Sequence, residues 1–171
     1  MKPYYESPDS SIRVYHARCE DVIASVLPVR EVALCHCDPP YGTGMRSLGN
    51  NGGIVGVPRA KTTRRLSGKG AAVRVFPPVT GDNKPFDPAP LLALGRPAVM
   101  WGANYYSARL PDETGWIFWD KREDFGSDDG SDGELAWSNL GGALRTFRHL
   151  WRGALRASER EDKHLHPTQK P

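Results

Sequence analysis

The residues best suited to chemistry are four consecutive ones, Asp38-Pro39-Pro40-Tyr41, at the end of an apolar run. The Asp38 carboxylate can accept one hydrogen of a planar amine, and the Pro39 carbonyl can accept the other, since Pro40 has no N–H to compete for it. Two acceptors at one nitrogen would localise its lone pair and make it more nucleophilic. Tyr41 adds an aromatic face on which a planar ring could stack. A turn that merely ends a strand is the alternative interpretation, because Asp and Pro are ordinary turn formers.

The apolar run before this tetrapeptide, residues 32–37, predicts a buried strand of a parallel sheet. Prolines that cannot donate to a strand ladder then end it. In open α/β sheets, ligands collect beyond the carboxyl ends of the strands, so Asp38 is expected at the ligand-binding edge.

The remaining pattern alternates strands with short helices, which predicts an α/β fold in one domain over residues 1–171. Residues 144–151 suit either a strand or a helix. Helices are expected at 19–27, 88–94 and 104–110, and strands at 11–16, 97–101 and 116–119.

Residues 42–80 show neither helical nor strand periodicity and predict a long mobile loop. The stretch from Gly42 to Gly81 contains basic residues but no Asp or Glu, whereas the whole chain has a net charge of only +3. Such a loop could grip the phosphates of a nucleic acid without reading its sequence. A solvated loop that touches nothing is the alternative. The candidate phosphate contacts are Arg46, Arg59, Lys61, Arg64, Arg65 and Lys69.

Other motifs follow the tetrapeptide in order: Trp101-Gly102-Ala103-Asn104-Tyr105-Tyr106, Trp116-Ile117-Phe118-Trp119-Asp120-Lys121, Ser131-Asp132-Gly133-Glu134-Leu135-Ala136-Trp137 and His166-Pro167-Thr168-Gln169-Lys170-Pro171. In this order they resemble the permuted, beta-type family of DNA amino-methyltransferases, especially the short phage and prophage versions. The likeness spans nearly the whole chain. No single motif is decisive, but the ordered set is specific.

The resemblance implies a partial Rossmann-like methyltransferase sheet with helices on both faces and S-adenosylmethionine as methyl donor. Asp38, Pro39, Pro40 and Tyr41 match the family's catalytic motif. Thr168 and Lys170 match a segment beside the methyl donor, with a plain loop as the alternative. Residues 122–160 correspond to the family's target-recognition region. Within it, Asp132 and Glu134 are interpreted as part of a solvated turn.

The sequence departs from the family in two places. A Phe-x-Gly-x-Gly loop that binds S-adenosylmethionine should follow Pro171, so the domain is expected to be incomplete as given. Either the sequence is a fragment, or the gene is truncated, or a second copy, in a homodimer, or another chain completes the domain. Ala17-Arg18 stands where many members have Gly-Asp, which puts any ligand contact there in doubt.

Composition excludes several other classes of protein. No run approaches the roughly 18 apolar residues of a membrane span, and no secretory signal is evident at Met1, so a cytoplasmic location is expected. Cys35 and Cys37 are too close together for a zinc pair and would face one side of a strand, with His36 on the other. Buried thiols and no metal are expected.

The leading hypothesis is an adenine-specific, S-adenosylmethionine-dependent DNA methyltransferase that acts on double-stranded DNA. Asp at the first motif position favours adenine over cytosine, by resemblance. The alternative is an inactive remnant that only binds DNA. Methylation of a protein glutamine amide is a third hypothesis, and Asp38 and the basic loop argue against it, since the related motif usually begins with Asn.

Overall fold

The computed structural model describes residues 1–26, 31–44, 79–127, 131–152 and 155–158. Its helical segments are α1 (Cys19–Val26), α2 (Ala89–Leu92) and the 3-10 turns η3 (Ala103–Tyr105) and η4 (Ser107–Arg109). The strands are β1 (Tyr5–Glu6), β2 (Arg13–Val14), β3 (Cys35–Cys37), β4 (Ala98–Trp101), β5 (Gly115–Asp120), β6 (Gly133–Ser138), β7 (Arg145–Arg148), β8 (Trp151–Arg152) and β9 (Leu155–Arg156).

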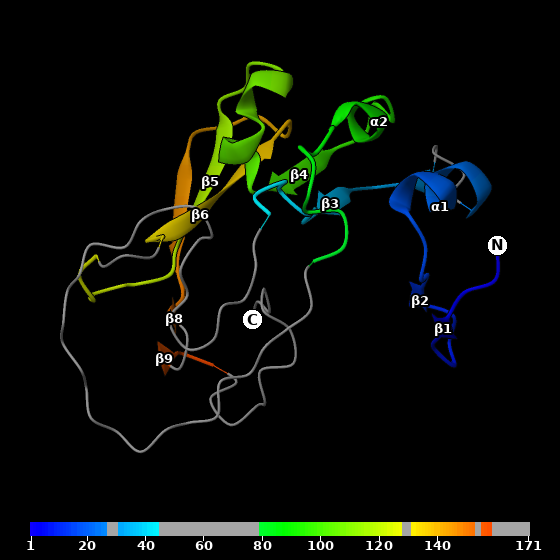
Figure 1. The fold of residues 1–171 in the computed structure, drawn as a ribbon, viewed down its shortest axis with the longest axis horizontal. Coiled ribbons are helices and arrows are strands. Elements are labelled where there is room, and N and C mark those ends of the chain that lie inside the picture. Colours follow the sequence, from blue (N-terminus) through cyan, green and yellow to red (C-terminus); the bar gives the residue numbers. More distant parts are fainter. Residues whose placement is uncertain (27–30, 45–78, 128–130, 153–154, 159–171) are drawn as a thin grey trace.

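A five-stranded mixed sheet in the order β3-β4-β6-β5-β7 forms the centre of the fold (Figure 1). β3 pairs in parallel with β4, and β5 pairs in parallel with β7, while β6 is antiparallel to both β4 and β5. β3, β4, β5 and β7 therefore run in one direction. Their carboxyl ends meet at one edge, where Asp38, Gly102 and Lys121 follow β3, β4 and β5.

One face of this sheet carries the apolar core. Cys37 pairs with Met100, and Met100 pairs with Trp137, so their side chains share a face. Met100 and Trp137 are almost fully buried, and Leu91 of α2 and Ala103 of η3 pack into the same cluster. Ile23 of α1 packs against it as well. The helical residues in this cluster thus all cover one face; the described residues do not confirm the expected helices on both faces.

The opposite face is lined with rings. Trp119 stacks on Phe147 with ring centroids 5.8 Å apart, and Trp101 contacts both of them edge to face. Trp101 Nε1 donates to His36 Nε2 at 2.7 Å. His36 therefore lies on the face opposite the two neighbouring cysteines, as the alternation of a strand predicts.

The described elements confirm the mixed α/β class and most of the expected segments, with three corrections. The strand expected to be buried at 32–37 is shorter, Cys35–Cys37, and only partly buried, because it lies at the edge of the sheet and His36 is exposed. The helix expected at 104–110 is instead the two 3-10 turns η3 and η4, because Tyr106 between them adopts φ −137°. The stretch at 133–138, which was not expected to form a strand, is β6. Within the described residues, no helix combines the length and apolar character that crossing a bilayer requires.

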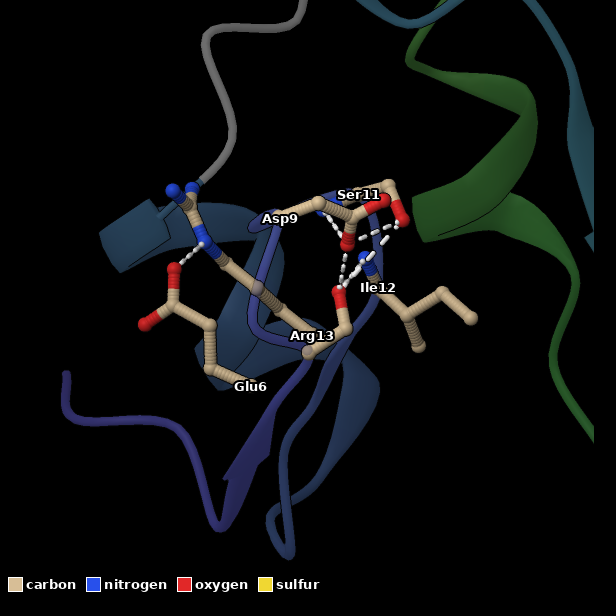
Figure 2. A network of polar contacts seen from close by, with 6 residues as sticks. Glu6, Asp9, Ser11, Ile12 and Arg13 are labelled. Atoms are coloured by element: carbon tan, nitrogen blue, oxygen red, sulfur yellow. Dashed lines mark hydrogen bonds and ion pairs between the residues drawn. The ribbon is translucent and has the colours of Figure 1, made fainter.

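The N-terminal hairpin of β1 and β2 depends on a polar network at its turn (Figure 2). Asp9 Oδ1 accepts hydrogen bonds from the Ser7 hydroxyl at 2.6 Å, the Ser11 hydroxyl at 2.8 Å and the Ser11 N–H at 3.2 Å. The Ser7 oxygen in turn accepts from the Ile12 N–H at 2.9 Å. A two-stranded hairpin is marginal alone, so these bonds contribute much of its order.

We expect this hairpin to lose order at strongly acidic pH. The hydrogen bonds from Ser7, with those from Ser11 next, lower the pKa of Asp9 from 3.8 to about 2. A depressed carboxyl pKa contributes stability above pH 3.8, and that contribution is lost as pH falls towards about 2. NMR titration of the Asp9 carboxyl carbon should show this midpoint, together with loss of the cross-strand contact between Tyr5 and Val14.

Asp9→Ala should weaken the Tyr5–Val14 contact at neutral pH as well. Asp124→Ala, which removes an exposed acid outside the hairpin, is the matched control and should leave it unchanged. An intact hairpin in Asp9→Ala would show that the turn does not depend on this carboxylate.

Candidate active site

Asp38 lies at the carboxyl end of β3, on the edge where the sequence places it. Its side chain is exposed, whereas the next residue, Pro39, is buried. The buried proline fixes the backbone, and the acid before it faces solvent. A carboxylate in that position can reach a ligand outside the protein.

Tyr41 is held by the segment that follows β4. Its ring stacks on Tyr105, with centroids 5.2 Å apart and planes 13° from parallel. Gly102, at φ +69°, leaves space that the ring occupies, since a Cβ there would lie 2.0 Å from Tyr41 Cε1. The absence of a side chain at Gly102 is therefore what lets the motif dock against the end of β4.

Tyr105 is the site residue that sequence reasoning missed. It covers one face of Tyr41, the ring expected to hold a planar ligand, and is itself 54% exposed. The available signal was its place in the Trp-Gly-x-Asn-Tyr motif, directly after the strand that neighbours β3. The two tyrosines form a short stack that ends in an exposed ring.

The Tyr41 hydroxyl lies between two carboxylates. It donates to Asp38 Oδ1 at 2.6 Å, and Glu134 Oε2 lies 3.5 Å away. Burial, followed by the hydrogen bond to Asp38, raises the pKa of Tyr41 far above its ordinary value. The phenol thus stays protonated at neutral pH and acts as a hydrogen-bond donor.

Glu134 corrects the expectation of a solvated turn. It lies in β6, opposite Trp119, and forms an ion pair with Lys121. The two side chains are only 16% and 18% exposed, and Lys121 Nζ also lies 4.8 Å from the centre of the Trp119 ring. Asp132 just before the strand is exposed, as expected.

The buried carboxylate of Asp82 fixes the backbone of residues 42–44, which directly follow the motif. It is 5% exposed and accepts from the N–H groups of Gly42 at 2.8 Å and Thr43 at 3.1 Å. The Thr43 hydroxyl donates to its second oxygen at 3.2 Å. The Gly44 N–H donates to the Asp82 carbonyl at 2.8 Å. Gly42 and Gly44 are therefore engaged with the protein itself.

The two cysteines of β3 are partly buried beside the core. Burial raises the pKa of the Cys37 thiol to about 12. Among the described residues, no group of three His, Cys, Asp or Glu side chains gathers as a metal site would need.

Several candidate residues lie outside the described residues. They are the six basic residues Arg46, Arg59, Lys61, Arg64, Arg65 and Lys69, and the candidate cofactor residues Thr168 and Lys170. The candidate recognition region at 122–160 is described in part. Its β6 and β7 belong to the central sheet, and β8 and β9 form a separate hairpin where Arg156 lies over the Trp151 ring at 4.4 Å.

Gly102→Ala should destabilise the protein through its clash with Tyr41. Gly95→Ala is the matched control, because Gly95 has a similar φ of +59° but no atom within 4 Å of a built Cβ. Both variants bear a left-handed backbone cost of roughly 1–2 kcal/mol. Gly102→Ala should lose about 1–3 kcal/mol more from overpacking. Urea unfolding measures both, and equal losses would mean that the Tyr41 ring is not confined there.

Comparison with known proteins gives no relative on which function could be based. No family model, no curated protein and no solved structure matches this chain. The function is therefore inferred from the chemistry of the site and the resemblance of its motifs.

Proposed function

We propose that this protein is a DNA methyltransferase that transfers a methyl group from S-adenosylmethionine to the exocyclic amino group of adenine. One observation carries the proposal. An exposed carboxylate, Asp38, stands at the carboxyl edge of the parallel strand β3, bonded to Tyr41, whose ring stacks on the exposed Tyr105. An acceptor for amine hydrogens beside an aromatic surface is what binding of an adenine base requires, and this arrangement supports the proposal.

The chemistry of adenine explains why these groups belong together. Its amine lone pair is conjugated into the ring and attacks poorly. Asp38 accepts one amine hydrogen and the Pro39 carbonyl accepts the other, which draws the nitrogen towards tetrahedral geometry. Positioning then contributes much of the rate, since the amine must face the methyl group in line.

A base inside a duplex cannot reach Asp38, so the target nucleotide must leave the helix at a cost of a few kcal/mol. Stacking on an aromatic side chain contributes roughly 1–3 kcal/mol of binding free energy per base, which offsets part of this cost. The exposed ring of Tyr105 offers such a stacking surface. The basic residues between Gly42 and Gly81 are proposed to bind the phosphates of double-stranded DNA.

The described residues do not include a cradle for S-adenosylmethionine. The glycines at 42 and 44, which could have offered backbone N–H groups, are bonded to Asp82. Thr168 and Lys170 remain the proposed donor-side residues, outside the described part of the chain. S-adenosylmethionine would supply the electrophilic methyl group.

The test uses the protein together with whatever residues are encoded after Pro171, because the loop that binds S-adenosylmethionine is expected there. It is incubated with tritiated S-adenosylmethionine and unmethylated DNA. We expect label in DNA, recovered after digestion as N6-methyladenine. Asp38→Ala should reduce the rate by about 10²–10³, as loss of one preorganised transition-state contact does. Asp112→Ala, an exposed acid outside the site, should retain activity.

Salt-sensitive DNA binding without any label, in the given chain and in the form extended past Pro171, would refute catalysis and leave the inactive DNA-binding remnant. Label recovered in N4-methylcytosine would correct the target base but keep the reaction.

Tyr105→Ala should raise KM for DNA, because the exposed stacking surface is lost. The loss of roughly 1–3 kcal/mol corresponds to a decrease in kcat/KM of about 5- to 150-fold. Tyr105→Phe keeps the ring and should behave like the unmodified protein. Equal activity of Tyr105→Ala and Tyr105→Phe would exclude Tyr105 from base binding.

A further inference from the structure

The Tyr41 hydroxyl has two carboxylates within reach and bonds to the one that the proposed chemistry needs. Its bond to Asp38 Oδ1 is 2.6 Å long, and Glu134 Oε2 is 3.5 Å away. Asp38 and Glu134 are far apart in sequence: Asp38 follows β3, Glu134 lies in β6, and β4 separates these two strands in the sheet. Tyr41 is therefore where these two acids meet.

The bond to Asp38 opposes the role proposed for that residue. A carboxylate that already accepts a short hydrogen bond from a phenol has less negative charge to offer an amine hydrogen. The hydroxyl cannot simply be released, because Tyr41 is half-buried and an unsatisfied buried donor is costly. Full acceptor strength at Asp38 therefore requires a second acceptor for the Tyr41 hydroxyl.

Glu134 has the position and the support to be that acceptor. An ordinary O–H···O bond is about 2.7–2.8 Å long, so the gap closes with a shift of less than about 1 Å. The ion pair with Lys121 holds the Glu134 carboxylate in place, and both side chains are mostly buried. Lys121 is fixed in turn, since its backbone N–H donates to the Asp132 carbonyl at 3.0 Å and its ammonium lies over Trp119.

We propose that Glu134 is a positioning residue that takes over the Tyr41 hydroxyl from Asp38 when an amine-bearing base reaches Asp38, with Lys121 holding Glu134 in place. This inference rests on the proposed methyl transfer. Neither Glu134 nor Lys121 touches the base; both act through Tyr41. The exchange moves one hydrogen bond and leaves every proton on its own oxygen.

A double-mutant cycle tests the exchange. Glu134→Ala should lower kcat about tenfold, the effect of one ordinary hydrogen bond. Tyr41→Phe keeps the ring but has no hydroxyl to transfer, so Glu134→Ala should have no further effect on kcat in that background. Glu134→Gln keeps an acceptor oxygen and should retain more activity than Glu134→Ala. Equal losses from Glu134→Ala in both backgrounds would reduce Glu134 to a structural role and overturn the proposal.

A second measurement does not depend on activity. In a crystal structure of Asp38→Ala, the Tyr41 hydroxyl should lie about 2.7 Å from Glu134 Oε2. A hydroxyl that turns to water instead would overturn the exchange. If the unmodified protein transfers no methyl group but the Asp38→Ala structure shows the contact with Glu134, the proposed function fails while the alternative acceptor stands.

Discussion

The parallel pairing of β3 with β4 is the constraint on which the site depends. Because Cys37 lies beside Met100, the chain leaves both strands at the same level, and the residues that follow them must share one small space. Gly102 makes this possible, since any side chain there would overlap Tyr41. The tetrapeptide is therefore shaped as much by the strand beside it as by its own prolines.

Carboxylates from distant parts of the sequence hold this edge together. Asp82 binds the backbone just after the tetrapeptide, and Glu134 brings β6 and Lys121 to the Tyr41 hydroxyl. Each is well buried and has donors around it, so each acts as a fixed acceptor. Asp38 differs in being exposed, although it too accepts a hydrogen bond, from the Tyr41 hydroxyl.

The sequence predicted the elements whose signal is local. α1 and β4 were expected because their apolar residues have a helical spacing or form a short continuous run bounded by proline. The sequence did not predict β6, because its first residues, Gly133 and Glu134, are typical of an acidic turn. They form a strand because they pair with β5. The prediction of a helix at 104–110 was wrong, because the backbone of Tyr106 leaves the helical conformation and separates two 3-10 turns.

The tetrapeptide Asp38-Pro39-Pro40-Tyr41 could be placed at a strand end from sequence, but its neighbours could not. The contacts of Tyr41 with Tyr105 and of its hydroxyl with Glu134 join residues that only the strand order brings together. Asp82 was likewise unremarkable in sequence, because an aspartate between glycine and asparagine suggests a surface turn.

The Cys37 thiol, one residue before Asp38, has a practical consequence. Burial raises its pKa to about 12, so the thiolate, which is the form that alkylating reagents attack, is much rarer at neutral pH than for an exposed thiol. Separation of β3 from the core would expose this sulfur and bring its pKa back towards the ordinary value. The rate at which an alkylating reagent labels Cys37 should therefore increase under conditions that open this edge of the sheet.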